Sequence, residues 1–374
     1  MKFTVSSTAL SNRLQAIGRV ITQKNNLPIL ECFLFEINDN KLLVTASDSE
    51  TTLSATIDLV ESSENFRFAI RAKTIQDVMK EIPEQPLTFD VNPNNLSIIA
   101  IYQNGKYSVV GLDAKEYPTG TSIDHEAMEM TITSNVLLEG INHAMFAIGD
   151  DGMRPVMNGI FFEFTPEGLT MVATDSRKMV CEKNSSIKSL ENMSFVLPKK
   201  PALMLKNLLE KNDTSISIHF NKSNAQITSS DFSMTNRLIE GRYPNYKAVI
   251  PKENPNCFTI DRATILSALK RILVFSNQGT SLVKIRLNKN LLILSTQDID
   301  FSTSAEEAIV CEYNGMPMSI GFNGNYLIEM LSNIPGENIT MQLADPSKAG
   351  IIVPSIQEEN MDLLMLLMPS MLND

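Results

Sequence analysis

The sequence has 374 residues and is 43% hydrophobic, which allows two or three domains with ordinary cores and excludes a disordered chain. Its formal net charge of −11 argues against a polyanionic partner, although a locally basic surface can coexist with an acidic exterior. The longest apolar run, from Leu363 to Met368, is far shorter than the ~20 residues that a membrane-spanning helix needs.

The start of the chain has no apolar segment of the secretory kind, so we expect no signal peptide. The cysteines Cys32, Cys181, Cys257 and Cys311 show no CxxC spacing, and the three histidines are scattered. We therefore expect reduced thiols, no metal, no cofactor and a cytoplasmic protein.

One pattern opens the chain and returns twice. A short alternating strand is followed by a polar cluster suited to a helix N-cap, and then by an amphipathic helix. Because solenoid units recur every ~20–50 residues, a repeat of this length indicates three copies of a whole domain. The three copies of the pattern cover residues 3–17, 130–144 and 258–272.

The rest of each copy follows one order: a hairpin, a third strand, a short strand with a second helix, and three last strands. The expected hairpins are 29–37 with 41–47, 159–164 with 169–174, and 282–287 with 291–296, and the third strands are 51–59, 177–184 and 301–310. The second helices with their preceding strands occupy 66–82, 195–211 and 320–334. The last strands are 87–91, 97–102 and 106–112, then 215–220, 225–229 and 232–238, then 339–343, 350–353 and 361–367. This is an α+β arrangement, with domains predicted at 1–124, 127–253 and 256–374.

Several local stretches, in order and in register with the triplication, resemble one known family. They are Met1-Lys2-Phe3-Thr4-Val5, Leu27-Pro28-Ile29-Leu30, Asn158-Gly159, Val172-Ala173-Thr174-Asp175, Gly241-Arg242-Tyr243-Pro244-Asn245-Tyr246 and Met368-Pro369. With three strand-rich domains of two helices each, the chain resembles a bacterial DNA sliding clamp, the β subunit of DNA polymerase III holoenzyme.

The resemblance implies three tandem copies of a DNA-clamp domain, each with two helices packed on β-sheets. Two chains would join head to tail into a six-domain ring whose helices face the hole, because heterologous contacts close into a ring when the rotation permits. This homodimer would encircle double-stranded DNA without sequence preference and would perform no chemistry. Its implied partners are the replicative DNA polymerase, an ATP-driven clamp loader and repair proteins, which bind through linear peptide motifs. No membrane is implied.

DNA binding that permits sliding needs weak phosphate contacts from Lys and Arg. The alternative interpretation is that these side chains are ordinary solvated charges on helix faces. The last helix, near 323–333, has no Lys or Arg, so we expect the third domain to hold DNA less well. The resemblance implies DNA contacts for Lys24 and Arg154, and the basic residues on or beside the helices add Arg71, Lys73, Lys199, Lys200, Lys206, Lys270 and Arg271.

The resemblance also implies an apolar groove between the second and third domains that takes short peptides. Methionine is a flexible gap-filler and suits a groove that accepts many peptides. The alternative is that Met157, Met179 and Leu366 are plain core residues. Ser370 departs from the family pattern, so the peptide preference is expected to differ. The matching positions are Met157, Thr174, Ser176, Arg177, Met179, Pro244, Val249, Leu366, Met368 and Pro369.

Ring closure is expected to use Val274 and Phe275 at the end of the third domain's first helix, unless Phe275 is a core residue of its own domain. The facing surface on the first domain would use Ile75, Met79, Lys106 and Tyr107, with Glu306 and Glu307 available to pair with Lys106.

Two other classes of function remain open at this point. A scaffold of three repeated domains would bind proteins without encircling DNA. A hydrolase could use Asp175, since Asp48, Asp175 and Asp298 each follow a strand, but such Asp residues are also common turn caps. No G-x-x-x-x-G-K-[ST] motif occurs, so the energy for opening a ring would come from another protein.

Overall fold

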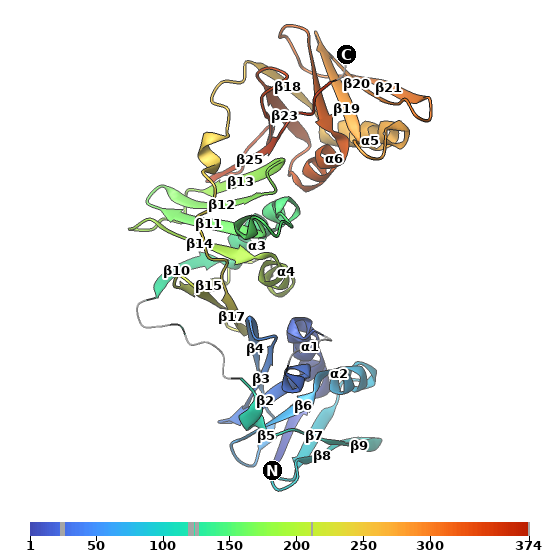
Figure 1. The fold of residues 1–374 in the computed structure, drawn as a ribbon. Helices are drawn as coiled ribbons and strands as arrows, with labels where there is room; N and C mark the ends of the chain where they lie inside the picture. Colours follow the sequence, from blue (N-terminus) through green and yellow to red (C-terminus); the bar gives the residue numbers. More distant parts are fainter. Residues whose placement is uncertain (23–26, 119–122, 124–126, 211, 373–374) are drawn as a thin grey trace. The chain divides into compact units, whose positions relative to one another are not determined.

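The computed structural model describes residues 1–22, 27–118, 123, 127–210 and 212–372. They form two compact units (Figure 1). Unit 1 consists of Met1–Leu138 with Leu203–Leu238, and unit 2 of Glu139–Ala202 with Ile239–Asp374. The division passes through the second repeat, so each unit holds one outer repeat entire and part of the middle one. The domain boundaries given above stay a prediction.

Every repeat has two helices, as the sequence pattern predicts. The first helix of a repeat starts at a polar cap directly after a strand: the Ser6 hydroxyl accepts the Ala9 N–H at 3.1 Å, and the Asp261 carboxylate accepts the Thr264 N–H at 2.7 Å. The helices are α1 Ser7–Ile17, α2 Ala72–Glu81, α3 Ser134–Ala144, α4 Lys199–Leu208, α5 Arg262–Ile272 and α6 Gly324–Asn333.

Unit 1 contains two antiparallel sheets. The smaller has the order β5-β1-β7-β8-β9 and the larger the order β10-β15-β16-β17-β4-β3-β2-β6. The strands of the first are β1 Lys2–Ser6, β5 Glu61–Ser62, β7 Pro86–Val91, β8 Ser97–Tyr102 and β9 Gly105–Val110. Those of the second are β2 Cys32–Asn38, β3 Lys41–Ser47, β4 Thr51–Asp58, β6 Phe66–Arg71, β10 Met128–Thr133, β15 Ser215–Phe220, β16 Asn224–Thr228 and β17 Phe232–Arg237.

Unit 2 is built in the same way. Its larger sheet has the order β14-β11-β12-β13-β25-β24-β23-β18, and its smaller sheet the order β21-β20-β19-β22. The larger contains β11 Gly159–Thr165, β12 Gly168–Thr174, β13 Lys178–Asn184, β14 Met193–Pro198, β18 Asn256–Asp261, β23 Asn338–Leu343, β24 Gly350–Pro354 and β25 Met361–Leu367. The smaller contains β19 Leu282–Asn288, β20 Leu291–Asp298, β21 Thr303–Val310 and β22 Met318–Asn323.

Each larger sheet joins strands of two repeats. In unit 1, β4 of the first repeat pairs with β17 of the second, and in unit 2, β13 of the second repeat pairs with β25 of the third. We call these pairs the first and second joints. The strands in the corresponding positions of the smaller sheets, β9 and β21, lie at free edges. An edge strand presents unpaired backbone N–H and C=O groups, so both edges are open to another strand.

Aromatic and aliphatic side chains fill the core between the sheets and helices of each unit. In unit 1 the rings of Phe3 and Phe89 stack with centroids 4.8 Å apart, and Phe35 packs against Phe68 at 5.3 Å. All four rings are fully buried. Such pairs contribute about 0.5–1.5 kcal/mol beyond the burial of their area.

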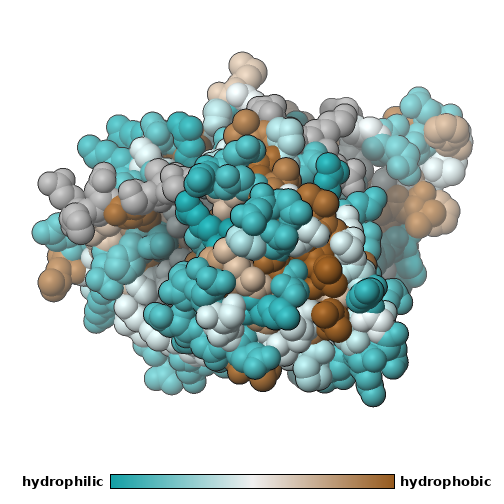
Figure 2. Space-filling view, turned by 90° about the horizontal axis from the view of Figure 1, so that it is seen from below, coloured by the Kyte–Doolittle hydropathy of each residue, from teal (hydrophilic) through white to brown (hydrophobic). Residues whose placement is uncertain are grey.

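Some apolar side chains remain at the surface, and Figure 2 shows brown residues among teal ones on the face it draws. They include Val110 at the end of β9 (73% exposed) and, in the third repeat, Val274, Ile299 and Phe301. Phe301 was predicted to begin a strand, but β21 starts at Thr303 and Phe301 lies in the turn before it. Within the described part of the chain, no helix combines the length and apolarity needed to cross a membrane.

Candidate functional site

The second joint carries a buried apolar cluster. Met179 of β13 and Leu366 of β25 are register partners across the joint, and their side chains are 2% and 3% exposed. They pack together with residues of β12, β14 and the segment after β17. We call this the joint cluster; its buried members are Val172, Met179, Val196, Tyr243, Tyr246, Ala349 and Leu366.

The segment that links the second and third repeats is held against the joint cluster by two tyrosines. The Tyr243 ring stacks on Phe161 with centroids 4.5 Å apart, and its hydroxyl donates to the Val172 carbonyl at 3.4 Å. The Tyr246 hydroxyl donates to Glu163 Oε2 at 2.6 Å, and Lys247 Nζ lies 2.8 Å from the same oxygen.

These contacts fix the ionisation of Glu163 and the position of the linking segment. Burial opposes ionisation of the Glu163 carboxyl, but the hydrogen bonds from Lys247 and Tyr246 outweigh it and lower its pKa. The segment is thereby anchored with Pro244 half-buried and Val249 53% exposed, beside the cluster. Burial also raises the pKa of the Cys181 thiol beside the cluster to about 12, so this thiol is neutral at physiological pH.

Two further segments lie beside the second joint: the turn between β12 and β13, and the 3-10 helix η5, Pro155–Met157. The Ser176 hydroxyl lies 3.3 Å from the Met157 sulfur and accepts Nη1 of Arg154 at 2.5 Å. The Thr174 hydroxyl donates to the Lys178 carbonyl at 2.8 Å and accepts the Ser176 N–H at 3.1 Å. These bonds hold Ser176 in the left-handed region, with φ of 77°.

The turn and η5 border a cavity of about 380 Å³, which is within the range of ligand pockets. At the rim of this cavity Arg154 Nε donates to Asp151 Oδ2 at 2.9 Å. The hydrogen bonds from the Met153 N–H and from the Arg154 guanidinium lower the pKa of the Asp151 carboxyl. The Arg177 guanidinium donates to the Tyr326 hydroxyl at 3.1 Å. Residues that line the cavity include Asp150, Asp151, Arg154, Met157, Asp175, Arg177 and Tyr326.

The C-terminal segment after β25 is also fixed beside the second joint, and we call it the C-terminal wall. The Met368 N–H donates to the Arg177 carbonyl at 2.8 Å, and the Ser370 N–H donates to the Gly321 carbonyl of β22 at 2.8 Å. A Cβ atom on Gly321 would lie 2.6 Å from the Ser370 oxygen, so only glycine lets the segment lie this close. Met368 is thus fixed with its side chain 44% exposed.

The structure therefore brings the predicted groove residues together. Met157, Thr174, Met179 and Leu366 are buried, which agrees with the core alternative for the two methionines and the leucine, whereas Arg177, Val249 and Met368 are exposed. Peptide binding by these residues stays a prediction. No role for Tyr243, Tyr246 or Tyr326 was predicted from the sequence. The two linker tyrosines lie within one of the stretches that carry the family resemblance, but Tyr326 has no local signal because it meets Arg177 only through the fold.

The basic residues are divided between exposed and engaged side chains. Arg71 and Lys73 are exposed at the start of α2, and Lys199 and Lys206 are exposed on α4, where Lys200 is half-buried. Arg154 is held at the cavity rim, and Arg271 binds Glu307 with Nε and Nη2 at 2.8 and 2.6 Å. Lys24 lies outside the described residues. The helix α6 carries no Lys or Arg.

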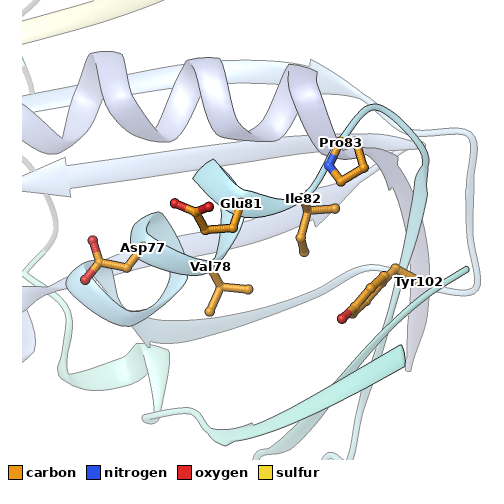
Figure 3. Close-up of a pocket in the computed structure, with 6 residues that line it drawn as sticks. All are labelled: Asp77, Val78, Glu81, Ile82, Pro83 and Tyr102. Carbon is orange, nitrogen blue, oxygen red and sulfur yellow. The ribbon is translucent and has the colours of Figure 1, made fainter. Parts of the chain in front are cut away.

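An open pocket of about 390 Å³ lies beside α2 in unit 1 (Figure 3). The side chains of Val78, Ile82 and Tyr102 converge on it, and the carboxylates of Asp77 and Glu81 lie at its rim (Figure 3). Ile75 and Met79 lie on the same apolar face of α2 as Val78. The prediction that their side chains contact a second copy is wrong. Each is 1% exposed and belongs to the core of unit 1, so neither side chain can meet a second copy.

The other predicted closure residues lie near the free edges. Val274 and Phe275, in the 3-10 helix η7 Leu273–Phe275, are 73% and 44% exposed, which excludes the core alternative for Phe275. Lys106 is exposed on β9, and the buried Tyr107 hydroxyl has no hydrogen-bond partner among the described residues. The acids expected to pair with Lys106 have partners in their own chain: Glu307 binds Arg271, and Glu306 lies 3.4 Å from Arg286.

The repeated aspartates cap turns. Asp48 Oδ1 accepts the N–H of Thr51 at 2.7 Å, and Asp175 Oδ1 accepts the N–H groups of Arg177 and Lys178 at 2.9 Å each. Asp298 accepts two backbone N–H groups in the same way. This is the capping alternative, and it gives the hydrolase interpretation no support. In the described residues, no group of three His, Cys, Asp or Glu side chains could hold a metal ion.

Sequence comparison gives consecutive matches along the whole chain. Residues 1–121 match the N-terminal domain of the DNA polymerase III beta subunit, residues 131–245 its central domain and residues 247–370 its C-terminal domain. The beta sliding clamp of Haemophilus influenzae is 28% identical over 94% of this chain and 95% of its own length. That of Escherichia coli K12 is 26% identical over 92% and 93%.

Solved structures agree in fold. A DNA polymerase sliding clamp from Pseudomonas aeruginosa superimposes with a TM-score of 0.93 at 24% identity, and one from Bacillus subtilis with 0.91 at 21%. Both comparisons cover 100% of each chain. The three-repeat α+β architecture described above is therefore shared over its full length.

Proposed function

The chain belongs to the bacterial DNA polymerase III beta-subunit family and is a non-catalytic sliding-clamp processivity factor, and we propose that it works as a homodimeric ring around double-stranded DNA. The observation that carries the proposal is the repeated joint. Two joints connect three repeats within the chain, and the strands that would make a third, β9 and β21, each pair on one side only and leave their outer edge open within the described residues. A head-to-tail pair of chains would satisfy both edges twice.

The pocket beside α2 supports the same pairing. Val78 and Ile82 correspond to Leu205 and Leu209 in the second repeat and to Met330 and Ile334 in the third. Those counterparts are at most 7% exposed, whereas Val78 and Ile82 line an open pocket. The difference indicates that the first repeat lacks a cover that its counterparts have within the chain.

We assign that cover to Val274 and Phe275 of a second copy. They are exposed next to β21, and the exposed Lys270 shortly before η7 complements the acidic pocket rim of Asp77 and Glu81, whereas Arg271 already binds Glu307 of its own chain. An apolar anchor surrounded by opposite charges is the usual construction of a specific interface. Lys106 and Tyr107 on β9 would lie along the same joint.

DNA is the proposed occupant of the ring. Grip through phosphates alone permits sliding, and Lys and Arg supply it without reading bases. The candidates are Lys24, Arg71, Lys73, Arg154, Lys199, Lys200 and Lys206. Retention on DNA would then depend mainly on topology, and the cytoplasm is where a chromosomal clamp of this kind would act.

The groove at the second joint is the proposed docking site for partner peptides. Its apolar floor and exposed methionine rim suit short linear motifs of the replicative polymerase, an ATP-driven clamp loader and repair proteins. Peptide binding there would leave both free edges available for ring closure.

One experiment tests the ring directly. The native mass is measured first, and the protein is then loaded on nicked circular DNA and the DNA is linearised. A clamp is a dimer in solution, stays on the circle and is lost from the linear form. Equal retention on the two forms would instead identify a scaffold that does not encircle DNA.

A further inference from the structure

The turn between β20 and β21 differs from its counterparts in the other repeats. In the first repeat Ser47 pairs with Thr52, and in the second Thr174 pairs with Met179. The corresponding Gln297 of the third repeat pairs with Ser304, so its turn is two residues longer. We call residues 299–302 the third-repeat turn.

The third-repeat turn is both ordered by hydrogen bonds and apolar at its surface. Asp298 Oδ1 accepts the N–H groups of Asp300 at 2.9 Å and Phe301 at 3.2 Å. The Thr303 hydroxyl, directly after the turn, donates to the Phe275 carbonyl at 3.3 Å and ties it to η7. Yet Ile299 is 80% exposed and Phe301 78%. A turn with its own capping bonds has no need of two exposed apolar side chains, so a second surface is expected to cover them.

The internal joints show which surface that is. At the first joint the Arg237 N–H, at the end of β17, donates to the Glu50 carbonyl at 2.8 Å. At the second, the Met368 N–H, just after β25, donates to the Arg177 carbonyl at 2.8 Å. In both, the acceptor directly precedes the first residue of the strand that follows the turn. In the third repeat that position is Ser302.

The corresponding donor lies at the end of β9. Val110 pairs with Ser97 as Arg237 pairs with Asn224, so Val110 takes the place of Arg237 in the first repeat. Val110 is the last residue of the free edge strand and is 73% exposed. Because Val110 takes the place of Arg237, whose N–H donates across the first joint, the Val110 N–H is expected to point to the open edge of β9.

We propose that the third-repeat turn is a contact of ring closure with no counterpart in the two joints within the chain, an inference that rests on the proposed head-to-tail dimer. The Ser302 carbonyl accepts the Val110 N–H of a second copy, and Ile299 and Phe301 pack on that copy's first repeat beside Val110. The longer turn thus adds apolar burial to a joint that, unlike the other two, has no linking segment to hold it.

The test compares dimer dissociation constants by sedimentation over a dilution series. Ile299→Ser with Phe301→Ser is expected to raise the constant at least tenfold, which is about 1.4 kcal/mol. The matched control is Met316→Ser with Ile356→Ser, which removes two equally exposed apolar side chains of the same repeat (79% and 86%) and is expected to leave the constant unchanged. An unchanged constant in the turn variant overturns the inference while the dimer stands. A wild-type protein that never dimerises overturns the ring as well.

A cross-link gives an independent readout. With Cys257 replaced by Ser, the pair Val110→Cys and Ser302→Cys is expected to yield covalent dimers on mild oxidation. Val110→Cys with Ile356→Cys is the control and is expected to remain monomeric under denaturing conditions. Equal cross-linking of both pairs, or of neither, contradicts the placement of the turn.

Discussion

Met179 and Leu366 face each other across the second joint, where Thr52 and Thr235 occupy the corresponding positions of the first. The two joints share strand pairing and hydrogen-bond geometry. Only the second joint is apolar at this position, because threonine carries a hydroxyl group and methionine and leucine do not. This difference supports the proposal that peptides dock at the second joint and not at the first.

Converting the second joint to the composition of the first is expected to weaken peptide docking. Met179→Thr with Leu366→Thr should weaken binding of a labelled clamp-binding peptide from a bacterial replicative polymerase at least tenfold in fluorescence anisotropy. Thr52→Ala with Thr235→Ala at the first joint is the control. Full affinity in the first variant would show that the peptide docks away from Met179 and Leu366.

Truncating the proposed anchor is expected to separate the ring into monomers. Val274→Ala with Phe275→Ala removes the exposed apolar atoms of η7 without disturbing a core, so the secondary structure measured by circular dichroism should stay that of the wild type. Sedimentation should report the mass of one chain. Val78→Ser with Ile82→Ser on the receiving pocket should do the same, and a persistent dimer in both would refute the pairing of these surfaces.

Reversing charge on α4 is expected to weaken DNA retention without changing ring mass. Each phosphate contact contributes a slope of about 0.9 in the log–log dependence of affinity on salt. Lys199→Glu with Lys206→Glu should therefore flatten that slope as well as lower retention on nicked circles. Lys289→Glu, in the β19–β20 turn, is the control, and equal losses in both proteins would point to net charge alone.

The Glu163 anchor predicts a specific response to acid. Its folded pKa lies below the ordinary value of 4.5, so its contribution to stability is complete above 4.5 and is lost as the pH falls through the folded pKa. Glu163→Gln should lower stability near neutral pH and reduce the acid dependence below 4.5. Urea unfolding of both proteins from pH 3 to 7 measures this, and parallel curves would show that the carboxylate has no such role.

Gly321 gives a test of the C-terminal wall. A side chain there meets the Ser370 oxygen, so Gly321→Val is expected to displace residues 370–372 and release Met368 from its position at the rim. Peptide affinity should fall severalfold while the dimer persists. Gly279→Ala, at a position bordered only by an asparagine oxygen at 3.3 Å, should leave binding intact. Unaltered affinity in the valine variant would show that the C-terminal segment takes no part in peptide docking.

The sequence alone predicts the repeats, their helices and most strands because alternation, capping and turn residues are local. It does not predict which face of a helix points to the core, or which residues far apart in the sequence come into contact. Ile75, Val78 and Met79 lie on one apolar stripe of α2, which Ile82 follows directly after the helix, and the pattern cannot tell which of these side chains face their own core. Tyr326 meets Arg177 across two repeats, so no local pattern indicates it. Phe301 fits a strand by composition, but the longer turn holds it outside.

The two free edges have a consequence for assembly. Because each chain carries both β9 and β21, any first association leaves one of each at its ends, ready to add a further subunit. Only the angle between successive sheets decides whether the ends meet after two subunits or growth continues into an open filament. Substitutions that change the angle at the two joints within the chain, far from β9 and β21, would thus favour an open filament over a closed ring.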